Sequence, residues 1–156
     1  MAQRGRAAVA PSDMAVARGR YAAILAGIAL FGMGVATYLT YVKLSGGTPV
    51  CGPLGGCETV QESQYSTVLG IPVSLFGLGY SLAVLGTLIA WWRTGDRRAL
   101  IGTYLLGLVG LMVAAYLVYL QLVVIQAVCT WCMAFDASVV VGFIAAIVTY
   151  RRTATA

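Results

Sequence analysis

GIPVSLFGLGYSLAVLGTLIAWW, residues 70–92, runs without one charged side chain and ends on two tryptophans. A helix needs roughly 20 mostly apolar residues to cross the hydrocarbon core of a bilayer, at about 1.5 Å of rise per residue. This run is long enough, and Trp91 and Trp92 stand beside Arg93, as aromatic anchors at a membrane interface do. We therefore predict a transmembrane helix over residues 70–92.

Three further runs have the same character, and the chain of 156 residues is 60% hydrophobic and only 10% charged. A soluble domain of this length needs more polar surface than that. The sequence predicts an all-α membrane protein, a bundle of four transmembrane helices over about residues 21–42, 70–92, 99–126 and 129–150. Residues 21–150 form this domain, and we expect residues 1–20 to be a flexible cytoplasmic tail and residues 151–156 to be a second one.

Residues 43–69, KLSGGTPVCGPLGGCETVQESQYSTVL, are the one long polar interruption between the apolar runs. Long loops between spans are more often functional than accidental. Val60, Tyr65 and Val68 could share one face of a helix, so we expect a short interfacial helix over residues 59–67. The loop and this helix would cap the extracytoplasmic end of the bundle.

The basic residues set the expected orientation. Nine of the ten fall in the termini and the second loop, where they are Arg4, Arg6, Arg18, Arg20, Arg93, Arg97, Arg98, Arg151 and Arg152. Only Lys43 lies in the long loop. Because cytoplasmic loops carry the excess of Lys and Arg, we expect a multi-pass protein of the cell inner or plasma membrane with both termini in the cytoplasm. The net charge of +5 then reflects orientation, and no nucleic-acid partner is expected.

Four cysteines are the main chemical resource of a chain that has no histidine and only five acidic residues. Cys51 and Cys57 flank a Gly-Pro-Leu-Gly-Gly turn, and Cys129 and Cys132 form C-T-W-C where the last span begins. A C-x-x-C at a helix start favours the thiolate, the attacking species in disulfide exchange. The topology puts both pairs on the outer side of the membrane, which is the arrangement of a redox relay.

Two other interpretations of the cysteines stay open. They could be structural disulfides in an oxidising compartment, although a bridge across C-x-x-C closes too small a loop to stabilise much. They could form a four-thiolate metal site, although the C-x5-C spacing is wider than usual for one. The relay is the favoured hypothesis, and with it we expect no metal.

The order of these motifs resembles that of the vitamin K epoxide reductase family, in particular its bacterial members that drive disulfide formation. The resemblance rests on the loop pair, then GIPVSLFGLGY at residues 70–80, then C-T-W-C, and it extends over residues 21–150. The stretch ESQYSTV at residues 62–68 also resembles the family segment, with Ser63 and Tyr65 at matching positions. An unrelated group of four-span quinone-linked thiol oxidases has its C-x-x-C in the first outer loop, the reverse of the order here.

The resemblance implies a catalytic role for each cysteine. Cys51 and Cys57 would take electrons from an extracytoplasmic thioredoxin-fold thiol oxidase, Cys57 would attack Cys129, and Cys132 would face a quinone, either menaquinone or ubiquinone. Many relatives carry the thioredoxin-like domain fused at the C-terminus, and we expect a separate protein here. The implied function is a quinone-dependent thiol–disulfide oxidoreductase that contacts membrane lipid and supports disulfide formation in exported proteins.

Four further residues are candidate quinone contacts: Asp136, Val73, Tyr80 and Ser63. Val73 and Asp136 stand where vertebrate members have an asparagine and a tyrosine that hold the quinone, so we expect quinone reduction rather than epoxide reduction. Asp136 lies four residues after Cys132 and so on the same helix face, and an acid inside a span is a functional candidate. It could bind or protonate the quinone, or instead reach interfacial water or cap a neighbouring helix.

Overall fold

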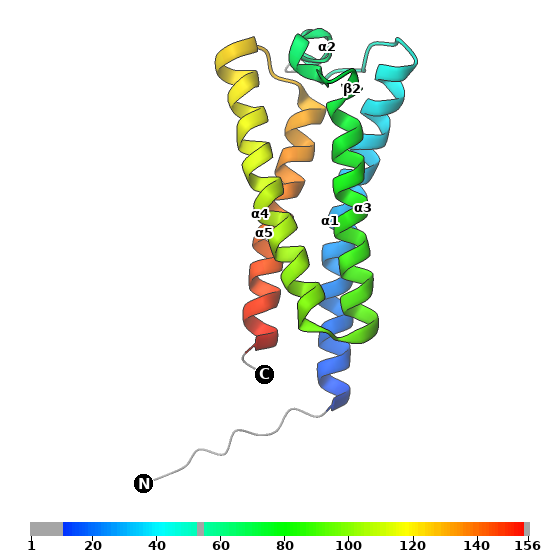
Figure 1. Cartoon of the computed structure of the whole chain (residues 1–156), viewed down its shortest axis with the longest axis vertical. Helices are drawn as coiled ribbons and strands as arrows, with labels where there is room; N and C mark the ends of the chain where they lie inside the picture. The colour runs from blue at the N-terminus through cyan, green and yellow to red at the C-terminus, as the bar shows by residue number, and fades with distance from the viewer. Residues whose placement is uncertain (1–10, 53–54, 155–156) are drawn as a thin grey trace.

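The computed structural model describes residues 11–52 and 55–154. Four long helices run side by side (Figure 1): α1 (Pro11–Leu44), α3 (Val73–Thr94), α4 (Arg97–Tyr119) and α5 (Thr130–Ala154). A π-helical segment, Leu120–Ile125, prolongs α4. Each of the four is long and apolar enough to cross a membrane. The predicted fold, an all-α bundle of four transmembrane helices with a loop and short-helix cap, is confirmed.

Within the described residues, the first helix already includes Pro11, well before the expected start at Tyr21. Hydropathy marks where lipid begins, whereas intrahelical hydrogen bonds continue wherever the residues favour a helix. The expected tail is thus helical from Pro11 onward, and residues 1–10 lie outside the described part. At the other end, α5 continues to Ala154.

The helices pack around a square, with α1 and α4 each against both α3 and α5. In the half that holds the start of α1 and the end of α5, the core is closed by two layers of buried side chains: Ala22, Trp91 and Leu100, then Leu25, Leu88 and Ala146. The Thr103 hydroxyl donates to the Thr87 hydroxyl at 2.9 Å and links α4 to α3. This end of the bundle is therefore solidly packed.

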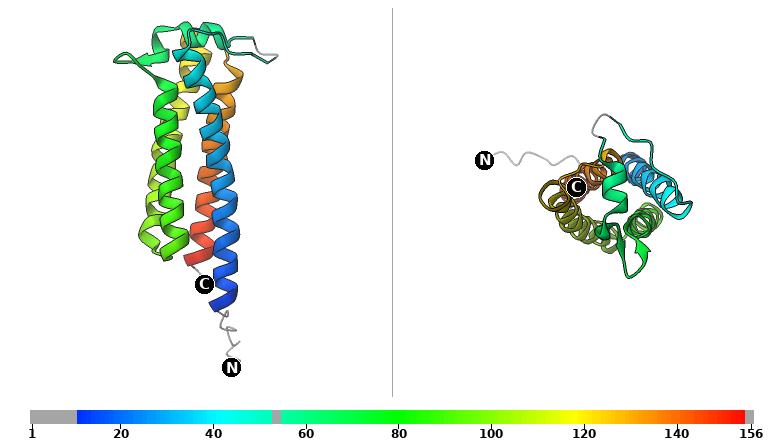
Figure 2. Two further views of the ribbon diagram at one scale, coloured as in Figure 1. Left: turned by 90° about the vertical axis from the view of Figure 1, so that its right-hand side faces the viewer. Right: turned by 90° about the horizontal axis from the view of Figure 1, so that it is seen from above.

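A cap lies across the opposite end, as the view from above shows (Figure 2). It consists of α2 (Cys57–Glu62), the 3₁₀ turn η1 (Gln64–Ser66) and an antiparallel hairpin of β1 (Thr67–Val68) and β2 (Ile71–Pro72). The expected single helix over residues 59–67 is thus divided. Ser63 has an extended backbone that ends α2, and its hydroxyl donates to the Val60 carbonyl at 2.7 Å.

Lys43 anchors the cap to the end of α1. Its ammonium group donates to the carbonyl of Gln61 and, at 3.0 Å, to the hydroxyl of Ser66. The last carbonyls of a helix carry partial negative charge, so a cation is well placed at the end of α2. Lys43, the one basic residue of the segment predicted as the long loop, therefore binds the cap on both sides of Ser63.

Candidate redox site

The first cysteine couple is a disulfide between Cys51 and Cys57, with the Cα atoms 5.7 Å apart. Cys57 is the first residue of α2 and is fully buried, whereas Cys51 is partly exposed. The backbone N–H of Cys57 also donates to the sulfur of Cys51 at 3.1 Å. Cys51 is therefore the sulfur of this couple that a soluble molecule can reach more easily.

The second couple, Cys129 and Cys132, is present as free thiols at the start of α5. Cys129 is fully buried and directly precedes the helix. The pKa of the Cys129 thiol is lowered, chiefly because the Cys132 side chain hydrogen-bonds to its sulfur, and the backbone N–H of Cys132, 3.3 Å away, adds to this. Burial opposes the shift but does not cancel it. The hydrogen bonds from Cys132 thus favour the thiolate form of Cys129 relative to an isolated buried thiol.

The loop that carries the first couple packs against the residue that precedes the second couple. A Cβ built on Gly56 would lie 2.7 Å from the nitrogen and 2.8 Å from the oxygen of Val128, too close for any residue but glycine. Cys57 follows Gly56 and Cys129 follows Val128, so the two buried cysteines adjoin a direct backbone contact. This contact brings the loop couple to the C-x-x-C couple.

A second contact fixes the loop just before Cys51. The indole N–H of Trp131, inside the C-T-W-C motif, donates to the carbonyl of Val50 at 2.7 Å. The N–H of Val50 donates to the hydroxyl of Tyr38 at 3.0 Å, and the rings of Tyr38 and Trp131 pack 5.0 Å apart. The sequence did not predict a role for Trp131. The one feature that could have indicated a role was its position between the two cysteines of the motif.

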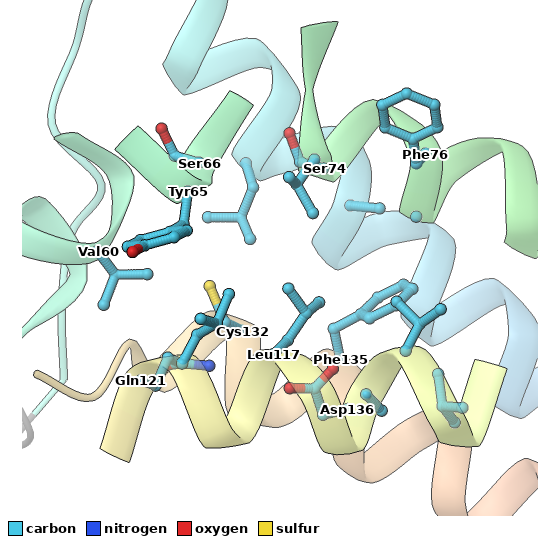
Figure 3. Close-up of a pocket in the computed structure, with 18 of the residues that line it drawn as sticks. Val60, Tyr65, Ser66, Ser74, Phe76, Leu117, Gln121, Cys132, Phe135 and Asp136 are labelled. Atoms are coloured by element: carbon cyan, nitrogen blue, oxygen red, sulfur yellow. The ribbon is translucent and has the colours of Figure 1, made fainter. Parts of the chain in front are cut away.

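A cavity of ≈ 280 Å³ lies between the helices directly beneath the cap (Figure 3). Its walls are mostly apolar side chains of α1, α3, α4 and α5, and α2 and η1 close its outer end. Cys132 lines it, so the last sulfur of the C-x-x-C couple borders an enclosed apolar space. No group of three His, Cys, Asp or Glu side chains that could hold a metal ion occurs among the described residues.

The four residues predicted to contact a quinone all line this cavity: Ser63, Val73, Tyr80 and Asp136. Asp136 is only 5% exposed, and its Oδ2 has no hydrogen-bond partner within residues 11–52 and 55–154. Tyr80 lies with its ring edge-on to Phe135, 6.5 Å between centroids. Residues from the cap, α3 and α5 thus converge on the space that Cys132 borders.

One polar residue of the site was missed by sequence analysis. Gln121 is 3% exposed, lines the cavity, and accepts a hydrogen bond of 2.8 Å from the backbone N–H of Cys129 through its side-chain oxygen. In the sequence, Gln121 is a polar residue near the end of a long apolar run, and its neighbours do not mark it as part of a site. The contact arises from the π-helical turn, which hydropathy does not reveal.

The model of the vitamin K epoxide reductase family matches residues 23–147. The match includes both cysteine couples, the cap, and most of each of the four long helices.

Proposed function

The chain belongs to the vitamin K epoxide reductase family, and on that premise we propose that it passes electrons from a thioredoxin-fold protein to a membrane quinone. Membership makes the chain a membrane thiol–disulfide oxidoreductase. The proposal adds the electron donor, the acceptor and the order of the cysteines. It is supported chiefly by the contact of Gly56 with Val128, which joins the segments that carry the buried Cys57 and Cys129. Cys51 is partly exposed and Cys132 lines the cavity, as the proposed order requires.

In the first step, a thiolate of the reduced protein partner attacks the sulfur of Cys51, the more exposed of its couple. The Cys51–Cys57 bond breaks and Cys57 leaves as a thiolate. The second thiol of the partner then displaces Cys51, so the partner is oxidised to a disulfide and both loop cysteines are reduced. Two electrons and two protons have entered the chain.

In the second step, the Cys57 thiolate attacks Cys129 of an oxidised Cys129–Cys132 couple, and Cys132 leaves. Cys51 then displaces Cys129 from the mixed disulfide and restores the loop disulfide. The structure has a disulfide at Cys51–Cys57 and two thiols at Cys129 and Cys132, the oxidation states that follow this exchange. In the last step the two thiols form a disulfide, and their two electrons and two protons reduce a quinone to a quinol.

The cavity supports a quinone as the acceptor. At ≈ 280 Å³ it lies just below the usual range of small-molecule sites, about 300–1,000 Å³, and it lies between helices that are long and apolar enough to cross a membrane. Val73 offers an apolar contact, whereas Ser63, Tyr80 and Asp136 offer polar atoms to the ring oxygens. Menaquinone and ubiquinone both have the required ring, and no metal takes part in these steps.

We further propose that the cysteine end faces the outside of the cell inner or plasma membrane and that both termini are cytoplasmic. The start of α1 and the end of α5 lie at one end of the bundle, opposite the cap (Figure 1). Lys43 is the single basic residue of the cap end among those described. After reduction of intact cells, a membrane-impermeant thiol reagent should label Cys51 of the wild type but should not label a Cys51→Ala/Thr94→Cys variant, and the opposite pattern would contradict this orientation.

The direct test uses purified protein, a reduced thioredoxin-fold donor and a water-soluble quinone. We expect Cys132→Ala to abolish quinone reduction, because no disulfide can form at the cavity. We expect Cys57→Ala to lose turnover with the protein donor but to keep it with a small dithiol that reduces Cys129–Cys132 directly. Normal turnover of Cys57→Ala with the protein donor would refute the proposed order.

The structural and metal-binding alternatives make a different prediction. A stapling disulfide or a thiolate metal site does not change its thiol count during turnover, whereas a relay cycles between reduced and oxidised couples. Thiol titration of the purified protein before and after addition of quinone therefore separates them. A count that stays constant would support the alternatives.

A further inference from the structure

Gln121 has a feature that the steps above do not use. It is a neutral polar side chain, 3% exposed, at a level of the bundle where the surrounding side chains are mostly apolar. Burying an amide costs free energy unless its donors and acceptor find partners. The hydrogen-bonding groups of the Gln121 amide therefore indicate which kind of group this side chain binds.

The bond to Cys129 fixes which way the amide points. The backbone N–H of Cys129 is a donor, so the atom of Gln121 that it meets at 2.8 Å is the carbonyl oxygen. The NH₂ group must then lie on the other branch of the amide. Gln121 lines the cavity, and Figure 3 shows its nitrogen beside the space that Cys132 and Asp136 also border. Two N–H donors thus face this space.

The backbone around Gln121 makes the amide rigid. Residues 120–125 form a π-helix that ends at Gln126, whose backbone is left-handed with φ 56°. The N–H of Ala127 donates to the main-chain oxygen of Gln121 at 3.1 Å. Both oxygens of Gln121 are thus held by the segment that leads into Cys129. π-helical turns of this kind are frequent at functional sites.

The position of these two N–H donors favours a particular kind of ligand. The cavity is lined mostly by apolar side chains, and its polar groups include the NH₂ of Gln121 and the carboxyl group of Asp136, whose Oδ2 has no hydrogen-bond partner among the described residues. An apolar ring that carries a carbonyl oxygen satisfies the amide and fills the apolar walls. A donor directed at an oxygen that gains negative charge during reduction also stabilises the reaction itself.

We propose that Gln121 is a quinone-binding residue: its NH₂ group donates a hydrogen bond to one carbonyl oxygen of the bound ring, while its own oxygen holds the backbone of Cys129. This inference rests on the proposed function. The Gln121 side chain then positions both the quinone ring and the C-x-x-C couple, and so it fixes the position of the ring relative to the sulfurs.

The test measures the carbonyl stretching bands of a ¹³C-labelled, water-soluble 1,4-quinone bound to the purified protein, together with quinone KM and kcat. Gln121→Met removes the donors and the acceptor. Gln121→Glu keeps an acceptor for Cys129 and has a donor only when protonated. Leu117→Met, on the same wall of the cavity, is the matched control.

In the wild type and in Leu117→Met we expect one carbonyl band shifted to lower frequency by hydrogen bonding. In Gln121→Met that shift should disappear and kcat/KM should fall about tenfold, as for the loss of one hydrogen bond. In Gln121→Glu the shifted band should return as the pH is lowered and the carboxyl group gains its proton. A purely structural role of Gln121 would not move this band.

An unchanged band in Gln121→Met, or in Gln121→Glu at high pH if the methionine variant does not fold, would overturn the inference. In either case quinone reduction by the wild type would leave the proposed function intact. A wild type that reduces no quinone with any dithiol would instead refute the proposed function.

Discussion

At the residue scale, two opposing effects act on the buried sulfur of Cys129. Cys129 is free, fully buried and hydrogen-bonded from Cys132, so burial and hydrogen bonding act on its thiol in opposite directions. The hydrogen bonds prevail and the pKa of Cys129 lies below its usual range. The short spacing of the C-x-x-C motif is what makes the first cysteine reactive, because it places the second thiol within reach of the first.

We predict that Cys132→Ala raises the pKa of Cys129. A hydrogen bond to the thiolate favours the charged form, so its removal should move thiolate formation to higher pH. Because the folded-state pKa is lowered, thiolate formation stabilises the wild type above the unfolded thiol pKa of about 8.5, and this is lost as the pH falls through the folded value. The ultraviolet absorbance of the thiolate, with Cys51–Cys57 oxidised and a Cys129→Ala control, measures the midpoint. An unchanged or lower midpoint would show that Cys132 is not the cause.

The sequence alone identified the residues whose chemical role follows from the residue type. Cysteines are few and reactive, and Asp136 stands out as an acid in an apolar span. It could not identify residues whose role lies in a contact. Gly56 is one of nineteen glycines and matters because Val128, distant in sequence, packs against it. Gln121 is a glutamine in an apolar run and matters because the π-helical turn brings its side chain to the backbone N–H of Cys129.

At the element scale, hydropathy predicted the helices but not their ends. The run over 99–126 reads as one helix, yet it changes from α to π at Leu120 and ends in a left-handed Gln126. Hydropathy does not mark this change, because a π-turn alters which backbone groups hydrogen-bond and not how apolar the residues are. The division of the cap between α2 and η1 could not be predicted for a similar reason. A serine is compatible with a helix, and the hydrogen bond from the Ser63 hydroxyl to the Val60 carbonyl is evident only in the structure.

We predict that Gly56→Ala slows exchange between the two couples. The backbone of Gly56, at φ −93° and ψ 11°, suits alanine, so the effect should come only from the collision of its Cβ with Val128. That collision must push the loop away from the start of α5. Small displacements of reacting groups cost up to about 100-fold in rate, and we expect a loss of about tenfold or more.

The measurement is rapid acid quenching and alkylation after one reduction of the loop couple, with mass spectrometry of the thiols. Gly79→Ala, in α3 with nothing within 4 Å of its added Cβ, is the control and should exchange at the wild-type rate. Equal rates in Gly56→Ala and Gly79→Ala would mean that exchange does not depend on the contact with Val128.

At the scale of the whole molecule, the bundle has two different ends. One is closed by layers of packed side chains and by Arg97, which donates to the hydroxyl of Tyr150 at 2.7 Å. The other holds the cavity, the cap and all four cysteines. The four helices therefore hold both cysteine couples and the cavity together at one end of the bundle. The proposed relay needs this arrangement, because its electrons must pass from a soluble thiol to an acceptor in the membrane.

The central claim is that Cys57 and Cys129 lie close enough to exchange bonds. The most direct measurement is the disulfide content of a Cys51→Ala/Cys132→Ala double variant, in which each couple keeps only its buried cysteine. After mild oxidation in the membrane, digestion and mass spectrometry without reduction should find the Cys57 and Cys129 peptides joined in one molecule. Recovery of both cysteines as free thiols, in a protein that remains folded, would contradict the account.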